Sequence, residues 1–401
     1  MQNPACFKVD DNFPYCTCSP SMYKCFGLLQ HDITRMLSPG TSSTNSASFP
    51  GIVRLDLGDH HSMILKHDGS VWSTALAFDD SLIALRGVRN CFTQSIASGV
   101  TALAAGSYHS VILKQDGSVW AMGRNYRGQL GDGTRDKKSM FSFVKVIPGA
   151  KAVAAGGSHS MVLTQQGHVW GAGSNKYGQL GSPGLLMQTI RFRQIISSGV
   201  EAVALGDIHS IVLNQDGSVL AAGRNINGQL GDGSKEDRNN FVKVLSSGVT
   251  DVSAGSYHSI ILKKDGSVWS TGWNQHGQLG DGSTTDRMNY VQVVSSGVKS
   301  IAAGSRHSMA LKQDGSVLAA GYNVRGQLGD ESNTNTQLFV QVISAGVKTV
   351  AAGAYHSMVL KQDGSVWATG SNEHGQFGDG SRKSENKFVR LALLICGADM
   401  A

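Results

Sequence analysis

An all-β fold, a seven-bladed β-propeller with four strands in each blade, is predicted by three features of the sequence. A His-Ser pair recurs seven times, at intervals of 48, 50, 50, 49, 49 and 49 residues. Internal repeats of such a length are typical of propeller blades. Each repeat also carries a Gly turn between two β-type runs, usually as Asp-Gly, which is a hairpin signal. None contains a clear 3.6-residue apolar period, so we expect almost no helix.

The repeat is clearest in residues 351–378, AAGAYHSMVLKQDGSVWATGSNEHGQFG. Its expected strands lie at Val350–Gly353, Ser357–Lys361, Ser365–Thr369 and, beyond a glycine-rich loop, Phe388–Leu391. Glycine and aspartate suit that loop because they accept positive φ. The other fourth strands are expected at Phe92–Ile96, Phe143–Ile147, Arg191–Ile195, Phe241–Leu245, Tyr290–Val294 and Phe339–Ile343.

The sizes of the side chains fit a radial arrangement of sheets. Small residues occupy the first strand of most repeats, where blades crowd around the axis, as in Ala104-Ala105-Gly106 and Ala302-Ala303-Gly304. One position of the third strand carries a large apolar residue: Trp72, Trp120, Trp170, Leu220, Trp269, Leu318 and Trp367. We interpret this position as packing between blades and not as a cofactor site.

Three motifs carry a resemblance to a known family: Ala-Ala-Gly-x-x-His-Ser, Asp-Gly-Ser-Val-Trp and Asn-x-x-Gly-Gln-Leu-Gly. The last motif recurs in six loops, at Gly128, Gly178, Gly228, Gly277, Gly326 and Gly375, with Phe377 replacing the leucine in the sixth. Repeats of this kind resemble those of the regulator of chromosome condensation repeat family, which forms seven-bladed propellers. The resemblance covers residues 51–395, so we expect one propeller there, an N-terminal arm at 1–50 and a tail at 396–401.

The functions that this resemblance implies depend on features that the chain lacks. The founding member of the family promotes nucleotide exchange on a Ran-type GTPase with a hairpin wedge inserted in one blade. Repeat intervals of 48 to 50 residues leave no room for such an insertion. Its chromatin binding uses a basic arm, whereas this arm balances three basic against three acidic residues. The ultraviolet receptor on this fold uses Gly-Trp-x-His runs, and only Trp273 lies off the shared tryptophan position here. The ubiquitin-ligase domains of other relatives are not found in this chain.

The formal charge of +6 does not indicate a strongly basic face. Basic residues follow the glycine-rich loops: Arg135, Lys137, Lys138, Lys235, Arg238, Arg287, Arg382 and Lys383. Acidic neighbours dilute them: Asp136, Glu236, Asp237, Asp286 and Glu385. A nucleic-acid interface is typically an undiluted basic patch. We therefore interpret this surface as a solvated rim of mixed charge, which disfavours a nucleic-acid partner without excluding one.

The N-terminal arm is expected to be mostly disordered, with a flexible Ser/Thr-rich linker at Ser38–Pro50. It contains Cys6, Cys16, Cys18 and Cys25. Zinc binding, with His31 as a further ligand, or a disulfide remain alternatives to free thiols, although the paired C-x2-C spacing of common zinc sites is missing. No apolar run is long enough for a membrane helix and no signal-peptide pattern is present. These features predict an intracellular, cytoplasmic or nuclear, soluble protein.

The repeated histidines are His61, His109, His159, His209, His258, His307 and His356. Adjacent residues of a strand point to opposite faces, so no His-Ser pair can form a dyad within itself. A residue that recurs in every blade is also a poor catalytic candidate. We predict a structural role, with each histidine hydrogen-bonding neighbouring backbone. The Asp-Gly turns lack a calcium-loop pattern, and we expect no catalytic residue, metal or cofactor.

The first repeat departs from the pattern between Ser73 and Asn90, where no Gly-Gln-Leu-Gly loop is found. This segment reads as a degenerate blade, either by drift or because the arm or a partner docks there. The two ends of the propeller predict how it closes. Since repeat one begins with an innermost strand and repeat seven ends with a fourth strand, we expect Phe388–Leu391 to dock beside the N-terminal strands, without a covalent bond.

The function predicted from these features is non-enzymatic binding of a protein partner by a monomer. The positions that vary between blades, just before the repeat histidine and beside the loop asparagine, carry aromatic and arginine side chains that interfaces favour. The candidate partner-binding residues are Tyr108, Arg124, Arg127, Arg224, Tyr257, Trp273, Arg306, Tyr322 and Tyr355. Guanine-nucleotide exchange on a small GTPase, and chromatin or nucleic-acid binding, remain as alternatives.

Overall fold

The computed structural model describes residues 51–74, 90–184 and 187–396. These residues form twenty-eight β-strands and no helix, which confirms the predicted all-β fold. The strands make seven antiparallel sheets of four strands each. The predictions for the N-terminal arm and its four cysteines lie outside the described residues, as does most of the degenerate segment of the first repeat. The part of the chain that is described holds no helix able to cross a membrane.

Each blade takes its four strands consecutively from the chain. Blade 1 contains β1 (Ile52–Leu57), β2 (Ser62–Lys66), β3 (Val71–Ser73) and β4 (Thr93–Ile96). Blade 2 contains β5 (Val100–Ala105), β6 (His109–Lys114), β7 (Ser118–Gly123) and β8 (Lys138–Val146). Blade 3 contains β9 (Ala150–Ala155), β10 (His159–Thr164), β11 (Val169–Ser174) and β12 (Gln188–Ile196). Blade 4 contains β13 (Val200–Leu205), β14 (His209–Asn214), β15 (Val219–Gly223) and β16 (Arg238–Leu245).

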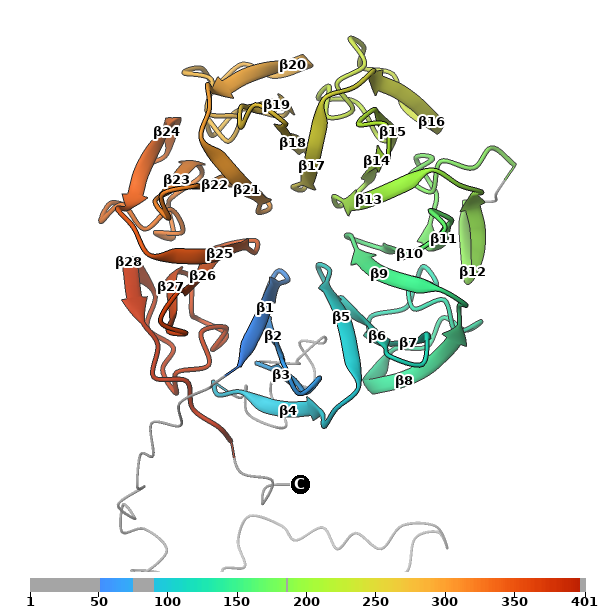
Figure 1. Ribbon diagram of the computed structural model, residues 1–401, viewed down its shortest axis with the longest axis horizontal. Helices are drawn as coiled ribbons and strands as arrows, with labels where there is room; N and C mark the ends of the chain where they lie inside the picture. Colours follow the sequence, from blue (N-terminus) through green and yellow to red (C-terminus); the bar gives the residue numbers. More distant parts are fainter. Residues whose placement is uncertain (1–50, 75–89, 185–186, 397–401) are drawn as a thin grey trace, which may run out of the picture. The chain divides into compact units, whose positions relative to one another are not determined.

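The remaining three blades follow the same order. Blade 5 contains β17 (Val249–Ala254), β18 (His258–Lys263), β19 (Val268–Gly272) and β20 (Arg287–Val294). Blade 6 contains β21 (Val298–Ala303), β22 (His307–Lys312), β23 (Val317–Gly321) and β24 (Thr336–Ile343). Blade 7 contains β25 (Val347–Ala352), β26 (His356–Lys361), β27 (Val366–Gly370) and β28 (Glu385–Arg390). Figure 1 shows the seven sheets standing around a central axis, with the first strand of each blade innermost and the fourth outermost.

The fourth strands of blades 2–7 begin three to five residues earlier than the sequence indicated. For example, β16 begins at Arg238, and not at Phe241, because Arg238 pairs with Gly223 of β15. Polar residues at this position look like loop residues in the sequence. In the structure, the Nε atom of Arg238 lies 2.7 Å from Oδ2 of Asp232 in the preceding loop. This ion pair and the backbone pairing hold the polar residues in the strand.

The glycine before each His-containing strand stands where neighbouring blades meet at the axis. A Cβ atom on Gly304 would collide with the carbonyl oxygen of Gly353 in the next blade and with the ring of His307. The same relation holds at all seven junctions, and Gly353 meets the carbonyl oxygen of Gly58 in blade 1. Only glycine fits at these seven positions, which agrees with the prediction of small residues near the axis.

The apolar core lies between blades, as the shared tryptophan position predicts. One cluster combines Met309 and Leu311 of blade 6 with Val347 and Val359 of blade 7, and Trp367 packs against it. The indole Nε1 of Trp367 donates a hydrogen bond of 2.9 Å to the Ser365 hydroxyl. Lys361 Nζ lies over this ring, 4.0 Å from its centroid. Trp367 thus covers the edge of this inter-blade core.

The glycine-rich loops are fixed by their own side chains and by the next blade. Asn274 Oδ1 accepts a hydrogen bond of 3.0 Å from the Leu279 amide, and its Nδ2 donates one of 2.9 Å to Asp281. The loop then lies against the fourth strand of blade 6, where Gly280 contacts the ring of Phe339. Gly280 has a φ of 75°, a conformation that other residues rarely adopt. Each loop therefore joins two blades.

The expected closure by Phe388–Leu391 is wrong in two respects. The strand β28 pairs with β27 as the fourth strand of blade 7. It does not join blade 1, which has four strands of its own. Instead, the segment that follows it contacts blade 1: the Phe92 amide donates a hydrogen bond of 2.8 Å to the Leu394 carbonyl. A covalent bond is also present, since a disulfide joins Cys91 to Cys396, with 5.6 Å between their Cα atoms.

Candidate functional site

The seven repeated histidines bind the next blade through serine hydroxyls. His307 Nε2 lies 2.8 Å from Ser357 Oγ of blade 7, and His356 Nε2 lies 3.0 Å from Ser62 Oγ of blade 1. The other five junctions carry the same bond, His61–Ser110, His109–Ser160, His159–Ser210, His209–Ser259 and His258–Ser308. We expected the histidines to bond backbone atoms. That expectation is wrong for the rings, because the regular spacing of the blades places a serine hydroxyl of the next blade within hydrogen-bond distance of each Nε2 atom.

The proton positions in this network follow from the serine contacts. Ser357 Oγ donates its proton to the Gln327 carbonyl of the preceding blade, 2.8 Å away. The hydroxyl must therefore accept from the Nε2–H of His307. Burial lowers the pKa of His307 to about 4 and that of His356 to about 3, so both rings are neutral near pH 7. The His–Ser bonds therefore link each blade to the next around the ring.

The variable side chains gather at one face of the propeller. The first and third strands of a blade run in the same direction, so the loops that follow them emerge on the same face. The residue before each repeat histidine and the residues after each third strand come from these loops. Eight of the nine candidate residues lie in contacts there: Tyr108, Arg124, Arg224, Tyr257, Trp273, Arg306, Tyr322 and Tyr355. Arg127 is exposed on its loop and lies outside these contacts.

The largest group of contacts spans blades 5 to 7. Tyr257, Trp273, His276, Tyr322 and Tyr355 follow one another with ring centroids 5.9, 5.0, 4.8 and 6.3 Å apart. All five rings are half-buried. They therefore form a continuous, partly exposed aromatic surface.

An arginine lies over this aromatic surface. The guanidinium carbon of Arg306 is 5.4 Å from the centroid of Trp273 and 5.9 Å from that of Tyr322. Cations are attracted to the faces of aromatic rings at such distances. The guanidinium of Arg306 is therefore attracted to these rings, which restricts its conformational freedom.

Two further groups continue the arrangement around the ring. The His60 ring contacts the His374 ring edge to face, with centroids 4.7 Å apart, and lies 6.2 Å from the Tyr108 ring. The guanidinium of Arg124 lies 3.9 Å from the Tyr108 ring centroid. In blades 3 and 4, Arg224 lies 4.5 Å from Tyr177. The three groups together are called the aromatic–arginine belt: His60, Tyr108, Arg124, Tyr177, Arg224, Tyr257, Trp273, His276, Arg306, Tyr322, Tyr355 and His374.

Four residues of the belt were not among the candidates predicted from the sequence: His60, Tyr177, His276 and His374. Three of them occupy one position, two residues after the loop asparagine, which reads Arg127, Tyr177, Asn227, His276, Arg325 and His374 along the chain. That variability was a usable signal. What the sequence does not show is which of these side chains turn towards a neighbouring blade and which, like Arg127, turn outward.

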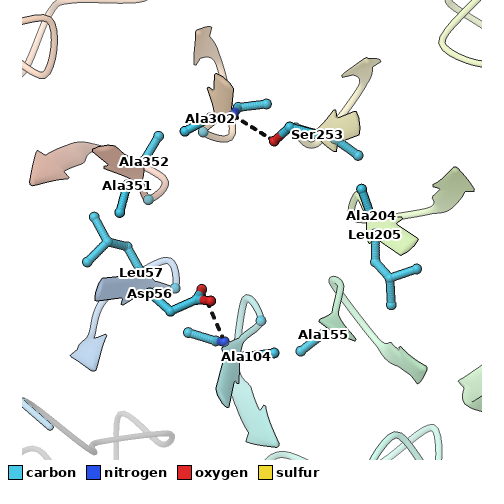
Figure 2. Close-up of a pocket in the computed structure, with 18 of the residues that line it drawn as sticks. Asp56, Leu57, Ala104, Ala155, Ala204, Leu205, Ser253, Ala302, Ala351 and Ala352 are labelled. Carbon is cyan, nitrogen blue, oxygen red and sulfur yellow. Dashed lines mark hydrogen bonds between the residues drawn. The ribbon is translucent and has the colours of Figure 1, made fainter. Parts of the chain in front are cut away.

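The belt surrounds the mouth of a central channel with a volume of about 400 Å³. Figure 2 shows part of the channel wall, where alanines such as Ala104, Ala204 and Ala302 lie beside the polar Asp56 and Ser253. These two side chains accept hydrogen bonds from the Ala105 and Ala303 amides, at 3.4 and 2.9 Å, respectively. Other polar residues that line the channel are Arg54, Asp59, Ser107, Asp207, Ser256, Ser305 and Thr349. The channel wall therefore combines small apolar side chains with hydroxyl and charged groups.

Two carboxyl groups lie at the belt end of the channel. Ser107 donates a hydrogen bond of 3.0 Å to Asp207 Oδ1. Burial, with the nearby Asp207 carboxylate, raises the pKa of Asp59 to about 7, while Arg124 opposes that rise. Burial likewise raises the pKa of Asp207, although Arg306 favours its charged form. The belt arginines thus lie close enough to influence both acids.

The belt has the chemistry of a binding surface. Half-buried tyrosine, tryptophan and arginine are the residues that most often dominate protein interfaces. Within the described ranges, no group of three or more His, Cys, Asp or Glu side chains is arranged to hold a metal ion. The outer rim is different, because its basic residues are neutralised locally, as in the Arg287–Asp281 and Lys383–Glu385 pairs, both at 2.6 Å.

Comparison with protein families agrees with the motifs. A model described as the RCC1-like domain matches residues 27–297. Models of the regulator of chromosome condensation (RCC1) repeat match residues 298–327, 347–376 and 314–360. A search of curated proteins gave no match.

Solved structures with the same fold include RCC1 proteins. Human WBSCR16 is 22% identical, with a TM-score of 0.68 over 76% of this chain and 85% of that one. Yeast RCC1 (Prp20), solved with Kap60, is 23% identical, with a TM-score of 0.64 over 72% of this chain and 74% of that one. Prp20p from Saccharomyces cerevisiae, described with its binding to Gsp1p and histones, is 22% identical, with a TM-score of 0.63 over 72% and 76%. At these identities the likeness concerns the fold.

Proposed function

The chain belongs to the RCC1-like domain family, and on this premise we propose that it is a non-enzymatic propeller whose aromatic–arginine belt binds a protein partner. The observation that carries the proposal is the belt itself. Its rings and guanidinium groups come from every blade of the propeller and lie on one face, around one channel mouth. The repeat fold does not require these side chains, since the same positions hold Ser158 and Ile208 in other blades.

The belt is suited to a protein partner because it is partly organised in advance. Side chains that are already fixed lose less conformational entropy on binding. Arg306 and Arg124 are held on aromatic faces. The guanidinium of Arg306 can donate to carboxylate or carbonyl oxygens of a partner, while the rings supply apolar contact area.

The experiment compares two sets of substitutions in the full chain. The belt variant carries Trp273→Ala, Arg306→Ala and Tyr322→Ala. The matched rim variant carries Met140→Ala and Phe143→Ala, which remove exposed apolar side chains from β8. Proximity labelling in the native cell identifies the neighbours of the unmodified protein. The belt variant should lose neighbours that the rim variant keeps. Equal labelling by both variants, with unchanged melting temperatures, would exclude the belt as the binding face.

A second candidate is nucleotide exchange on a small GTPase. It is favoured by the similarity to Prp20p, which is described with its binding to Gsp1p. The belt would then be the face that contacts the GTPase. Nucleotide release from a panel of purified small GTPases tests this candidate directly, and release that persists in the belt variant would separate exchange from belt binding.

Three further properties stay predictions. Chromatin or nucleic-acid binding would appear as an affinity that falls steeply with salt, whereas the locally paired charges of the rim favour no such effect. A monomer is expected in solution and can be checked by light scattering. The cytoplasmic or nuclear location can be checked by fractionation of the native cell.

A further inference from the structure

The junction between blades 7 and 1 contains a segment that follows the last strand. In the preceding junction, the loop of blade 6 reaches the fourth strand of blade 7 through a hydrogen bond of 2.8 Å from the Glu331 amide to the Asn386 carbonyl. The equivalent bond at the last junction runs from the Gly380 amide to the Asn90 carbonyl, at 2.7 Å. Here the segment 391–396, which we call the seam segment, lies against the loop and the strand.

The seam segment is bonded on both sides. The Leu394 amide donates a hydrogen bond of 3.0 Å to the Gly378 carbonyl in the loop of blade 7. The Phe92 amide donates to the Leu394 carbonyl, and the Cys396 amide donates to the Phe92 carbonyl, at 2.8 and 3.1 Å. Leu391 and Leu393 are buried in a core shared with Phe92 of blade 1. The segment therefore ties the two ends of the ring to each other.

The disulfide joins the same two partners. Cys91 lies directly before Phe92 in blade 1, and Cys396 ends the hydrogen-bonded part of the seam segment. The bond spans 305 positions of the sequence, almost the whole propeller. Cys91 is buried, at 9% exposure, whereas Cys396 is half-buried. An attacking thiolate therefore has its easier approach at the Cys396 sulfur.

We propose that Cys91 and Cys396 form a thiol–disulfide switch that locks and releases the seam segment. Release requires a dithiol reductant, such as a thioredoxin-type protein or dithiothreitol. One thiolate of the reductant attacks the Cys396 sulfur, the bond between the two cysteine sulfurs breaks, and Cys91 leaves as a thiolate. The second thiol of the reductant then displaces Cys396. The protein gains two electrons and two protons, and the reductant becomes a disulfide.

The switch reaches the belt through the loop of blade 7. Residues Asn372–Gly380 form this loop, and its Gly378 is held by the seam segment. The loop carries His374, whose ring contacts that of His60 of blade 1 edge to face across the junction. Reduction removes the covalent lock. The seam segment, still held by its hydrogen bonds and buried leucines, then opens more often and loosens this loop and the belt at that one position. The effect on a partner rests on the proposed function, whereas the locking of the seam does not.

The test uses the full chain in which the four arm cysteines are replaced, C6S, C16S, C18S and C25S, so that only the seam pair remains. Oxidation with oxidised glutathione should yield one intramolecular disulfide. Dithiothreitol should then raise the mass of the protein by that of two hydrogen atoms. Hydrogen exchange at the Phe92, Leu394 and Cys396 amides should speed up about a hundredfold on reduction, the change that a typical disulfide contribution implies. The Glu331 amide of the preceding junction should not respond.

Two variants separate the bond from a simple packing effect. Cys396→Ser, and Cys91→Ser with Cys396→Ser, should exchange at the seam like the reduced protein, whatever the redox conditions. Seam exchange that is equally slow in the oxidised and reduced protein would overturn the proposal, as would seam thiols that stay free after oxidation. Since no partner enters these measurements, their outcome is independent of belt binding. A partner then identified for the belt should bind the oxidised and reduced protein with different affinity.

Discussion

His356 of the last blade donates a hydrogen bond of 3.0 Å from its ring to the hydroxyl of Ser62 in the first blade. Six other junctions carry the same bond between consecutive blades. The closing junction therefore resembles the internal ones at its centre. What sets it apart is the seam segment and the disulfide farther from the axis.

Replacing a histidine of the network by another hydrogen-bond donor should cost less stability than truncating it to alanine. His307→Ala removes the donor to Ser357 and leaves a cavity in a site with no exposed atoms. We expect the free energy of unfolding to fall by about 2–4 kcal/mol. His307→Gln keeps an N–H donor and should lose less. Urea unfolding measures both, and equal losses would mean that the hydrogen bond contributes little.

Acid should destabilise the ring from about pH 6.5 downward. Burial lowers the pKa of the ring histidines to about 3 or 4, against 6.5 for an ordinary histidine. Between these values the unfolded chain binds protons that the folded chain does not. Stability then falls with falling pH, by about 1.4 kcal/mol per pH unit for each histidine.

Buried carboxyl groups oppose this trend. The pKa of Asp59 is raised to about 7 and that of Asp251 to about 6, and those of Asp56 and Asp207 are also raised, all by burial. Their folded forms bind extra protons, so they gain stability in acid. Because the histidines outnumber them, the melting temperature should still drop between pH 6.5 and 4. A melting temperature that rises in acid would contradict this balance.

The innermost glycines should resist substitution more than the turn glycines. Gly304 has an ordinary φ, but an added Cβ would collide with the Gly353 carbonyl and the His307 ring. At Gly346 the φ is 81° and the space is open, so Gly346→Ala costs only backbone strain, about 1–2 kcal/mol. Gly304→Ala should cost more, because backbone must shift. Thermal melts of the two variants decide which constraint is larger.

Removing the seam segment should destabilise the protein even when the disulfide is reduced. Leu391 and Leu393 are 8% and 6% exposed, and each buried leucine stabilises by roughly 1.5–3 kcal/mol. Deletion of residues 391–401 should therefore cost several kcal/mol under reducing conditions. Cys396→Ser, which keeps the leucines, is the control. If both variants melt at the same temperature, only the disulfide matters at the seam.

Several parts of the fold were predictable because they depend on local pattern. The recurring His-Ser pair, the Asp-Gly turn and the small first strand gave the number of blades and the strands of each. The early start of β16 could not be predicted, because Arg238 is held in the strand by its ion pair with Asp232. Belt positions were found through their variation between blades, yet His276 was missed, since its ring contacts Trp273 and Tyr322 only after blades 5 and 6 pack.

The sequence by itself determined the repeat, its four strands and the small residues at the axis, because these follow from turn chemistry and side-chain size within a single repeat. The tertiary structure decided which side chains meet across blades: His307 with Ser357, Arg306 with Trp273, and Cys91 with Cys396. The reason is geometric. Residues one blade apart come within hydrogen-bond reach only when the angle and spacing of neighbouring sheets are set, and residues at opposite ends of the chain meet only when the ring closes.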